Sequence, residues 1–199
     1  MIDEKRYTQI KNWTRNYIDE KCIYRGPPIP GKKPGTTYTW QFYLRNGLFN
    51  IDFLSAISQM FVYQIKKEVK NFNFQLAGLE TASTPMLAGI PLISATMGYE
   101  INAFSIRKER KKYGLLNWIE GIPNEKPVML IDDLCNSQES MSIAHNVVKE
   151  HNLKIFDYAF CIVNKTNKTS KEKIKADKYL PKNIKIIYLF DLDDFNLVD

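Results

Sequence analysis

From residue 74 to the C-terminus, short apolar runs alternate with segments of helical periodicity, and this alternation restricts the possible folds more than any other feature. Runs rich in β-branched and aromatic residues predict strands, whereas apolar residues spaced three and four apart predict helices. The expected strands are 74–79, 101–106, 128–131, 156–163 and 184–190, and the expected helices are 85–97 and 139–151. Strands that alternate with helices form a mostly parallel sheet covered on both faces. The sequence therefore predicts an α/β fold.

The first 70 residues are organised differently. Apolar residues on one helical face predict a helix over 4–21, and a longer stripe predicts a second helix over 52–70. The proline- and glycine-rich segment 26–35 can be neither a helix nor an interior strand, so we expect a loop or an extended arm, followed by a strand over 37–44. A length of 199 residues suits one domain. We expect residues 51–199 to form its core and residues 1–50 an N-terminal helix and a small additional segment.

The composition indicates a folded protein without a membrane span. Hydrophobic residues make up 44% of the chain, yet no apolar run approaches the roughly 18 residues that a spanning helix needs. The first residues contain no apolar signal-peptide core, so we expect a cytoplasmic protein with no membrane partner. Cys22, Cys135 and Cys161 are widely spaced, which is not typical of a metal site or of a disulfide framework.

The charge balance favours an anionic partner. Lysine and arginine number 28 against 22 acidic residues, and the net charge of +6 suits a small anionic substrate or a weak nucleic-acid surface. The most basic segments, 107–112 and 165–178, do not interleave aromatic residues as a stacking platform for single strands would. Nucleic acid is therefore the less favoured partner.

The segment 128–140 carries the clearest chemical signal. Four apolar residues are followed by Asp132 and Asp133, a short polar turn and the start of an amphipathic helix. Carboxylates at the carboxyl end of a strand can hold ribose hydroxyls or a hydrated Mg²⁺. Backbone N–H groups at the start of the following helix can hold a phosphate. This arrangement suits a phosphorylated sugar.

Two further segments follow predicted strands and should meet the acidic pair at the same edge of the sheet. Residues 78–85 are mostly small or hydroxylated and could present backbone N–H groups to an anion. Residues 107–114 form a cationic loop. An acidic pair flanked by two anion-attracting loops suits a polyphosphorylated sugar better than a neutral metabolite.

Four motifs, in this order along the chain, resemble those of the type I phosphoribosyltransferases, and most closely those of the orotate-specific enzymes. Phe42-Tyr43-Leu44-Arg45-Asn46-Gly47 resembles the family's N-terminal Phe-x-Leu-Lys-Ser-Gly segment, and residues 78–85 resemble its pyrophosphate loop. Arg107-Lys108-Glu109-x-Lys111-x-Tyr113-Gly114, followed by Glu120-Gly121, resembles its Arg-Lys-Glu-x-Lys-x-His-Gly loop and trailing Glu-Gly, and residues 128–140 resemble its phosphoribosyl-diphosphate signature. The resemblance implies a central mostly parallel sheet flanked by helices, with a small N-terminal hood segment.

The resemblance also implies roles for individual residues. Asp132 and Asp133 would be catalytic, binding the ribose hydroxyls of phosphoribosyl diphosphate or the water shell of a Mg²⁺ cofactor. Lys111 would neutralise the departing pyrophosphate from a loop that, in the family, reaches across a dimer into the neighbouring active site, so a homodimer is expected. The other substrate-binding residues implied are Arg45, Phe53, Thr81, Ala82, Ser83, Arg107, Lys108, Tyr113, Asn136, Ser137, Gln138, Glu139, Ser140 and Lys165.

The turn after the acidic pair departs from the family pattern. That turn usually reads Thr-Thr/Ala-Gly-Gly/Thr-Ser/Thr around the 5′-phosphate, whereas this chain has Asn136-Ser137-Gln138-Glu139-Ser140. A carboxylate about 4 Å from the phosphate would repel it by about 4 kcal/mol at an effective dielectric near 20. Two interpretations remain open. Either Asn136 and Glu139 form a pair resembling a capping box that occupies the anion site, or Glu139 points outward while Ser137, Ser140 and backbone N–H groups hold the phosphate.

Two further departures concern the acceptor base. Tyr113 replaces the histidine of the loop, and Lys165 stands near a family arginine that helps to recognise orotate. Lysine keeps the charge but loses the bidentate fork that suits a carboxylate. These changes leave the identity of the base more open than the fold.

Three functional hypotheses follow. The leading one is an enzyme that, with Mg²⁺, transfers 5-phosphoribosyl from phosphoribosyl diphosphate to a nucleobase, with orotate preferred, and releases pyrophosphate in nucleotide biosynthesis. The alternative is a non-catalytic regulatory or binding protein with the same fold and an altered 5′-phosphate turn. A nucleic-acid-binding regulator is a weaker third hypothesis.

Overall fold

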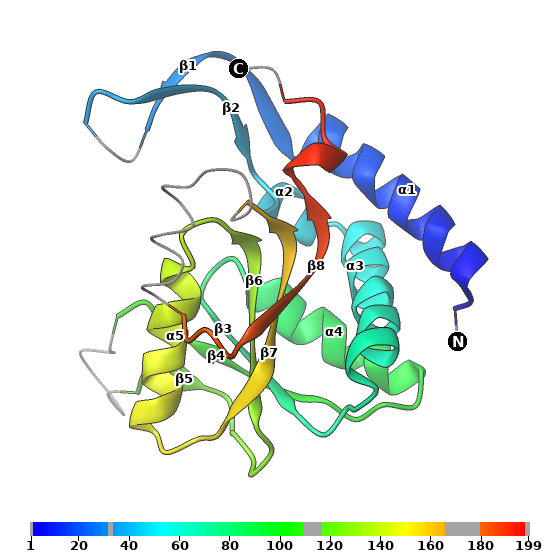
Figure 1. Ribbon diagram of the computed structural model, residues 1–199, viewed down its shortest axis with the longest axis vertical. Helices are drawn as coiled ribbons and strands as arrows, with labels where there is room; N and C mark the ends of the chain where they lie inside the picture. The colour runs from blue at the N-terminus through cyan, green and yellow to red at the C-terminus, as the bar shows by residue number, and fades with distance from the viewer. Residues whose placement is uncertain (1, 32–33, 110–116, 166–179, 198–199) are drawn as a thin grey trace.

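The computed structural model describes residues 2–31, 34–109, 117–165 and 180–197, and at its centre lies a six-stranded sheet (Figure 1). The strands, in the order in which they lie side by side, are β5 Ile119–Glu120, β4 Asn102–Ile106, β3 Gln75–Leu79, β6 Val128–Cys135, β7 Ile155–Asn164 and β8 Lys185–Asp191. All neighbouring pairs are parallel except β4 and β5. The predicted mostly parallel α/β sheet is confirmed.

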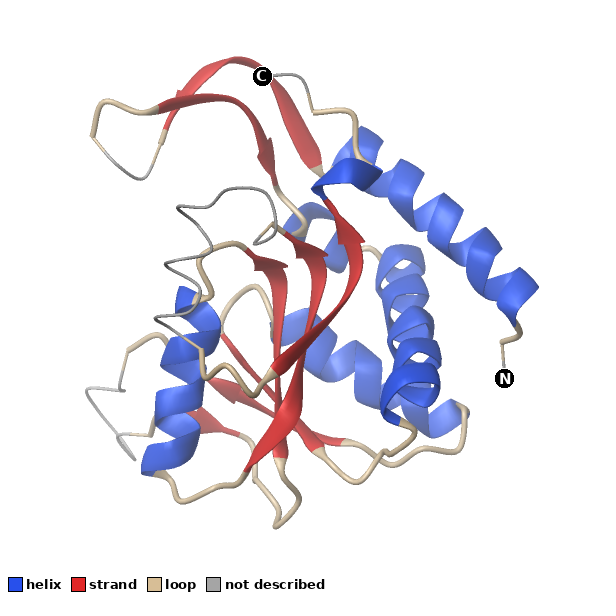
Figure 2. Ribbon diagram, viewed as in Figure 1, coloured by secondary structure: helices blue, strands red, loops and turns tan. Residues whose placement is uncertain are grey.

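Helices cover both faces of this sheet (Figure 2). Helices α3 (Ile51–Gln64) and α4 (Thr84–Thr96) lie on one face, and α5 (Glu139–Glu150) lies on the other. Helix α3 starts after Asn50, whose side chain accepts hydrogen bonds from two backbone N–H groups of the first turn and so satisfies donors without intrahelical partners. The helix expected over 52–70 ends differently, because its last turn is a π-helix at Ile65–Val69.

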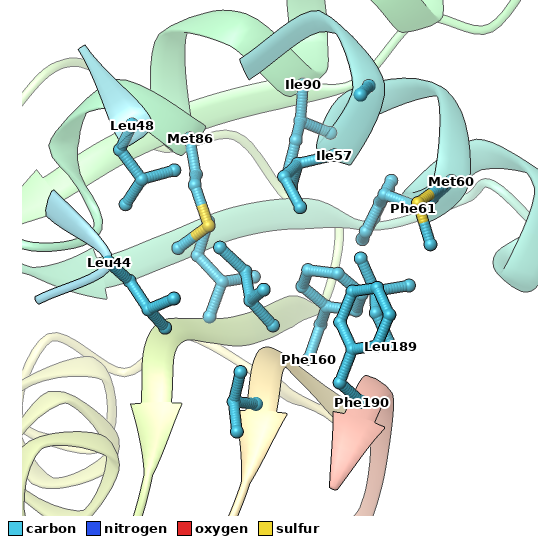
Figure 3. Packing of buried hydrophobic residues seen from close by; sticks show 14 of the residues in the cluster. Leu44, Leu48, Ile57, Met60, Phe61, Met86, Ile90, Phe160, Leu189 and Phe190 are labelled. Atoms are coloured by element: carbon cyan, nitrogen blue, oxygen red, sulfur yellow. The ribbon is translucent and has the colours of Figure 1, made fainter. Parts of the chain in front are cut away.

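The hydrophobic core is divided by the sheet into two clusters. The larger cluster joins α3 and α4 to β6, β7 and β8, and its aliphatic and aromatic side chains interdigitate in Figure 3. The smaller cluster places Met141, Ala144 and Val148 of α5 against Ala77 and Leu130 of the sheet. All three cysteines are buried and free. None of the helices in the described ranges has the length and apolar character needed to cross a membrane.

The N-terminal segment combines a helix with a two-stranded ribbon. Helix α1 (Glu4–Lys21) packs against α3, and β1 (Ile23–Pro30) pairs antiparallel with β2 (Thr37–Phe42). The pairing register shifts between Arg25 and Ile29, where Gly26, Pro27 and Pro28 lie. Prolines are tolerated there because they occupy an irregular stretch of an edge strand. Part of the segment expected as a loop or arm is therefore a strand.

Two short elements complete the described chain. Helix α2 (Arg45–Leu48) follows β2, and a single 3₁₀ turn (Leu192–Asp194) follows β8. Phe195 then packs against Phe42 of β2 and Phe190 of β8, with ring centroids 5.3 and 5.7 Å away. These aromatic contacts attach the ribbon to the sheet.

Strand β6 is longer than the sequence predicts, since it continues four residues beyond Ile131. Strand β7 pairs with it as far as Cys135, opposite Asn164, whereas β3 pairs with it only from Val128 to Leu130. Beyond Leu130, the edge of β6 that faces β3 is therefore open. In α/β sheets, the point where neighbouring connections run in opposite directions is where ligands bind.

Replacement of Gly78 by alanine should destabilise the protein by about 1–3 kcal/mol, the usual effect of overpacking a core. A Cβ atom at this position would lie 2.5 Å from Cβ of Ser83 and 2.6 Å from the carbonyl oxygen of Ile131, which is backbone and cannot rotate away. Urea denaturation measures the change. Gly26→Ala is the control, because the nearest atom there is the hydroxyl oxygen at the end of the Tyr24 side chain, 2.9 Å away. Equal stability of the two variants would contradict the close approach of β3 to β6.

Candidate active site

A pocket of about 260 Å³ opens between the carboxyl ends of β3 and β6 and the segment that joins β2 to α2. It contains both members of the acidic pair together with cationic, aromatic and amide side chains. Its lining residues are Gln41, Phe42, Tyr43, Leu44, Arg45, Leu79, Glu80, Ala82, Lys108, Asp132, Asp133, Leu134 and Ser140. The pocket therefore collects residues from four segments that are far apart in the sequence.

The acidic pair lies on β6 and is largely removed from water. The side chain of Asp132 is 8% exposed, and that of Asp133 is half-buried. Each carboxylate accepts a hydrogen bond from the next backbone N–H, at 2.9 Å for Asp132 and 2.8 Å for Asp133. These bonds orient both carboxylates, but they do not neutralise them.

Burial raises the pKa of Asp132 well above its ordinary value, and the neighbouring charge of Asp133 raises it further. A hydrogen bond from Ser140 acts in the opposite direction. Burial also raises the pKa of Asp133, which the positive charge of Arg45 partly offsets. Two adjacent buried carboxylates with oxygen donors only are suited to bind hydroxyl groups or a hydrated hard cation such as Mg²⁺.

Two cationic side chains line the same pocket. Arg45 is supplied by α2, and Lys108 follows the end of β4. The backbone N–H of Lys108 donates to Oε1 of Glu80 at 3.2 Å, so the segments after β3 and β4 are joined directly. The pocket can therefore hold a ligand that carries hydroxyl groups at one part and anionic groups at another.

The segment predicted to resemble a pyrophosphate loop reaches the pocket through only some of its residues. Ala82 lines the pocket, whereas Ser83 is fully buried and its hydroxyl donates to the carbonyl oxygen of Leu79 at 2.7 Å. Thr81 is exposed and follows a cis peptide bond, but it is not among the described residues that line the pocket. The part of this loop that lines the pocket is therefore Leu79, Glu80 and Ala82, and not its hydroxylated residues Thr81 and Ser83.

Three side chains expected to bind substrate lie elsewhere. Phe53 is 0% exposed within the core, where it packs against Tyr17, because the first turn of α3 faces α1. Arg107 points toward Glu120, with Nη1 3.3 Å from Oε1, because the β4–β5 pairing brings these residues together. Lys165 places its Nζ 4.7 Å from the ring centre of Trp40. None of the three is among the described residues that line the pocket.

The turn after the acidic pair is not capped as the sequence suggested. Helix α5 begins at Glu139, and its N-cap is Gln138, whose side chain makes no capping hydrogen bond. The proposed capping pair of Asn136 and Glu139 is therefore wrong, because Glu139 occupies the first helical position and not the third. Gln138 has a φ of 57°, in the left-handed region that favours glycine. In this turn, Ser140 lines the pocket, whereas Ser137 is not among the described residues that do so.

Two expected site residues, Lys111 and Tyr113, lie outside the described residues. Sequence reasoning also missed three polar residues of the pocket. Gln41 lies near the end of β2, and Tyr43 lies in the short link between β2 and α2, next to the predicted Arg45. Glu80 was overlooked although it directly follows the end of β3.

A larger groove of about 620 Å³ lies between α1 and α3, next to Trp13 and Asp52. It contains neither member of the acidic pair and none of the cationic residues described above. The smaller pocket is therefore the better candidate for chemistry, because it combines perturbed carboxylates with opposing positive charge.

Comparison with known proteins shows a shared fold. No protein-family model matches the sequence. Orotate phosphoribosyltransferase of Mycobacterium tuberculosis H37Rv is similar at 16% identity with a TM-score of 0.72, over 93% of this chain and 98% of the other. A phosphoribosyltransferase from Corynebacterium diphtheriae is similar at 19% identity with a TM-score of 0.70, over 94% of this chain and 98% of the other. Adenine phosphoribosyltransferase of Trypanosoma brucei is similar at 15% identity with a TM-score of 0.62, over 94% of this chain and 81% of the other.

Replacement of both aspartates, Asp132→Asn with Asp133→Asn, should stabilise the unliganded protein near pH 7 by about 0.5–2 kcal/mol, the range of single stabilising changes. Because folding raises both pKa values, the folded protein holds protons that the unfolded chain releases. Between the ordinary aspartate pKa near 4 and the raised values, stability falls as the pH rises. The advantage of the variant should therefore disappear as the pH falls toward 4.

Thermal denaturation between pH 4 and 8 measures this difference, with the exposed Asp157→Asn as the control. A variant that is less stable than the wild type at every pH would contradict the account of a destabilising acidic pair.

Proposed function

From the fold that this chain shares with the type I phosphoribosyltransferases, we propose that it transfers a 5-phosphoribosyl group from phosphoribosyl diphosphate to a nucleobase, with orotate as the preferred acceptor. The products are pyrophosphate and a nucleoside monophosphate, and the proposed setting is pyrimidine nucleotide biosynthesis. The neighbours include enzymes for orotate and for adenine, so the proposed preference rests on the cationic segment and the trailing Glu-Gly noted in the sequence.

The observation that carries this proposal is one pocket with two chemically opposite walls. Asp132 and Asp133 form the acidic wall on β6, and Arg45 and Lys108 supply positive charge from α2 and from the end of β4. A sugar with free hydroxyl groups fits the first wall, and a diphosphate at its anomeric carbon fits the second. A neutral metabolite would leave the two cations without a partner in the ligand.

The acidic pair fits a Mg²⁺ cofactor. Its oxygen donors are hard ligands, and burial is the main cause of the raised pKa of both groups. Asp132 and Asp133 would hold the ion through its water shell, and the ion would neutralise part of the diphosphate charge.

The residues of the chain supply the rest of the chemistry. A nitrogen of the base forms a bond to the anomeric carbon while the bond from that carbon to the diphosphate oxygen breaks. Positive charge develops on the sugar, beside Asp132 and Asp133, and negative charge develops on the leaving group, which Lys108 and Arg45 stabilise. We further propose that Lys111 and Tyr113 belong to this site and that the active form is a homodimer.

The second candidate function is a non-catalytic binding or regulatory protein. It is favoured by one observation, the carboxylate of Glu139 at the first position of α5, where the family pattern places a residue that binds the 5′-phosphate. Negative charge at a helix N-terminus satisfies the same electrostatic potential that would attract phosphate. A protein of this kind would keep the pocket but bind phosphoribosyl diphosphate weakly.

We expect phosphoribosyl diphosphate with Mg²⁺ to bind at micromolar concentration and Asp132→Asn with Asp133→Asn to abolish the binding, because the hydroxyl and cation contacts are lost together. Isothermal titration measures the affinity, and Asp157→Asn is the matched control. Pyrophosphate release with orotate, and separately with adenine, then tests transfer and the acceptor. A folded wild-type protein that gives no heat would favour the non-catalytic function.

The double change Gln138→Gly with Glu139→Thr should tighten binding of phosphoribosyl diphosphate at least tenfold, because it removes a negative charge and restores the family pattern. Gln138→Gly alone serves as the control. It should stabilise the fold by about 1 kcal/mol through relief of the left-handed conformation, with a smaller effect on affinity. If the double variant binds no better than the wild type, the charge at this turn is not the obstacle.

A further inference from the structure

Glu80 connects the ends of two neighbouring strands at the mouth of the pocket. Its backbone N–H donates to the carbonyl oxygen of Ile106 at 2.7 Å, which extends the parallel pairing of Leu79 with Ile106 by one bond. In a parallel ladder, the next bond would run from the N–H of Lys108 to the backbone carbonyl of Glu80. In this protein, Oε1 of the Glu80 side chain accepts that bond instead, at 3.2 Å. The side chain of Glu80 thus replaces its own backbone carbonyl as the acceptor of the first hydrogen bond beyond the end of β3.

The bond fixes the backbone of a residue whose side chain lines the pocket. Lys108 lies with Glu80 and the acidic pair around the same cavity. The preceding residue is held separately, since the N–H of Arg107 donates to the carbonyl oxygen of Trp118 at 2.9 Å and its guanidinium reaches Glu120. The Glu80 contact is therefore the one that ties Lys108 to the loop after β3.

The carboxylate of Glu80 should weaken the binding of an anion in this pocket, because like charges repel. Its presence there therefore requires an explanation. Glu80 does not form with Asp132 and Asp133 a cluster of three carboxylates suited to bind a metal ion directly, since the described ranges contain no such group. The hydrogen bond from the backbone N–H of Lys108 explains the presence of the carboxylate, because a charged acceptor makes a stronger hydrogen bond than a neutral one.

We propose that Glu80 is a positioning residue that holds the backbone of Lys108, so that the loop after β3 and the segment after β4 bind the diphosphate group of the ligand together. This inference rests on the proposed function for the nature of the ligand. The attachment of Lys108 can be measured without any ligand.

Two substitutions separate reach from charge. Glu80→Asp keeps the charge but withdraws the carboxylate by one methylene, and Glu80→Gln keeps an oxygen within reach but removes the charge. Exchange of the Lys108 amide proton with water, measured by NMR, should become about tenfold faster in Glu80→Asp, which loses the contact, and only about threefold faster in Glu80→Gln, which keeps the contact through a weaker, neutral acceptor. Glu109→Gln, which removes an exposed charge next to Lys108, is the control and should leave the exchange unchanged.

Titration with inorganic pyrophosphate and Mg²⁺ gives the second readout. Glu80→Asp should weaken binding about tenfold, whereas Glu80→Gln should bind at least as tightly as the wild type. Equal amide exchange in all variants would overturn the proposal, and so would unchanged pyrophosphate affinity in Glu80→Asp. If Lys108 exchange responds as expected while the wild type binds no pyrophosphate, the proposed function fails and the attachment of Lys108 by Glu80 stands.

Discussion

The unequal pairing of β6 is the constraint on which the candidate site depends. Strand β7 supports β6 as far as Cys135, whereas β3 leaves it after Leu130. Just beyond the last pair, Gly78 of β3 still lies so close to the carbonyl oxygen of Ile131 that a side chain at this position would clash with it. One edge of β6 is then open just where Asp132 and Asp133 follow. The backbone groups of these two residues are therefore not paired with β3.

The opposite wall of the pocket depends on contacts between distant parts of the chain. The backbone N–H of Tyr43 donates to the carbonyl oxygen of Cys22 at 2.6 Å, which fixes the link between the end of β2 and Arg45, the first residue of α2. Phe195 packs against Phe42 from the C-terminal side. The N- and C-terminal parts of the chain therefore meet at the ribbon, and the position of Arg45 relative to the acidic pair is set by packing outside the pocket.

Features that depend on the local residue pattern could be predicted from the sequence. Features that depend on contacts with residues far away in the chain could not. The alternation of apolar runs and amphipathic stretches gave the sheet, its order of elements and the acidic pair at one edge. The length of β6 could not be predicted, because polar residues continue a strand only when a neighbour such as β7 supplies hydrogen bonds. The same limit applies to Arg107 and Phe53. A motif shows which residue types are present, but the direction of each side chain follows from the β4–β5 pairing and from the packing of α3 on α1.

The turn before α5 has a left-handed backbone conformation that favours glycine, although its residue there is Gln138. Gln138 keeps a left-handed conformation that costs a non-glycine residue about 1–2 kcal/mol. No side-chain cap compensates at this position. The conformation persists because Met141, Ala144 and Val148 bury α5 against the sheet and so fix where the helix must begin. The packing of α5 thus supports the left-handed conformation of the residue that precedes it. At the start of the same helix, Glu139 places a negative charge in its first turn, and a negative charge there opposes the binding of an anion.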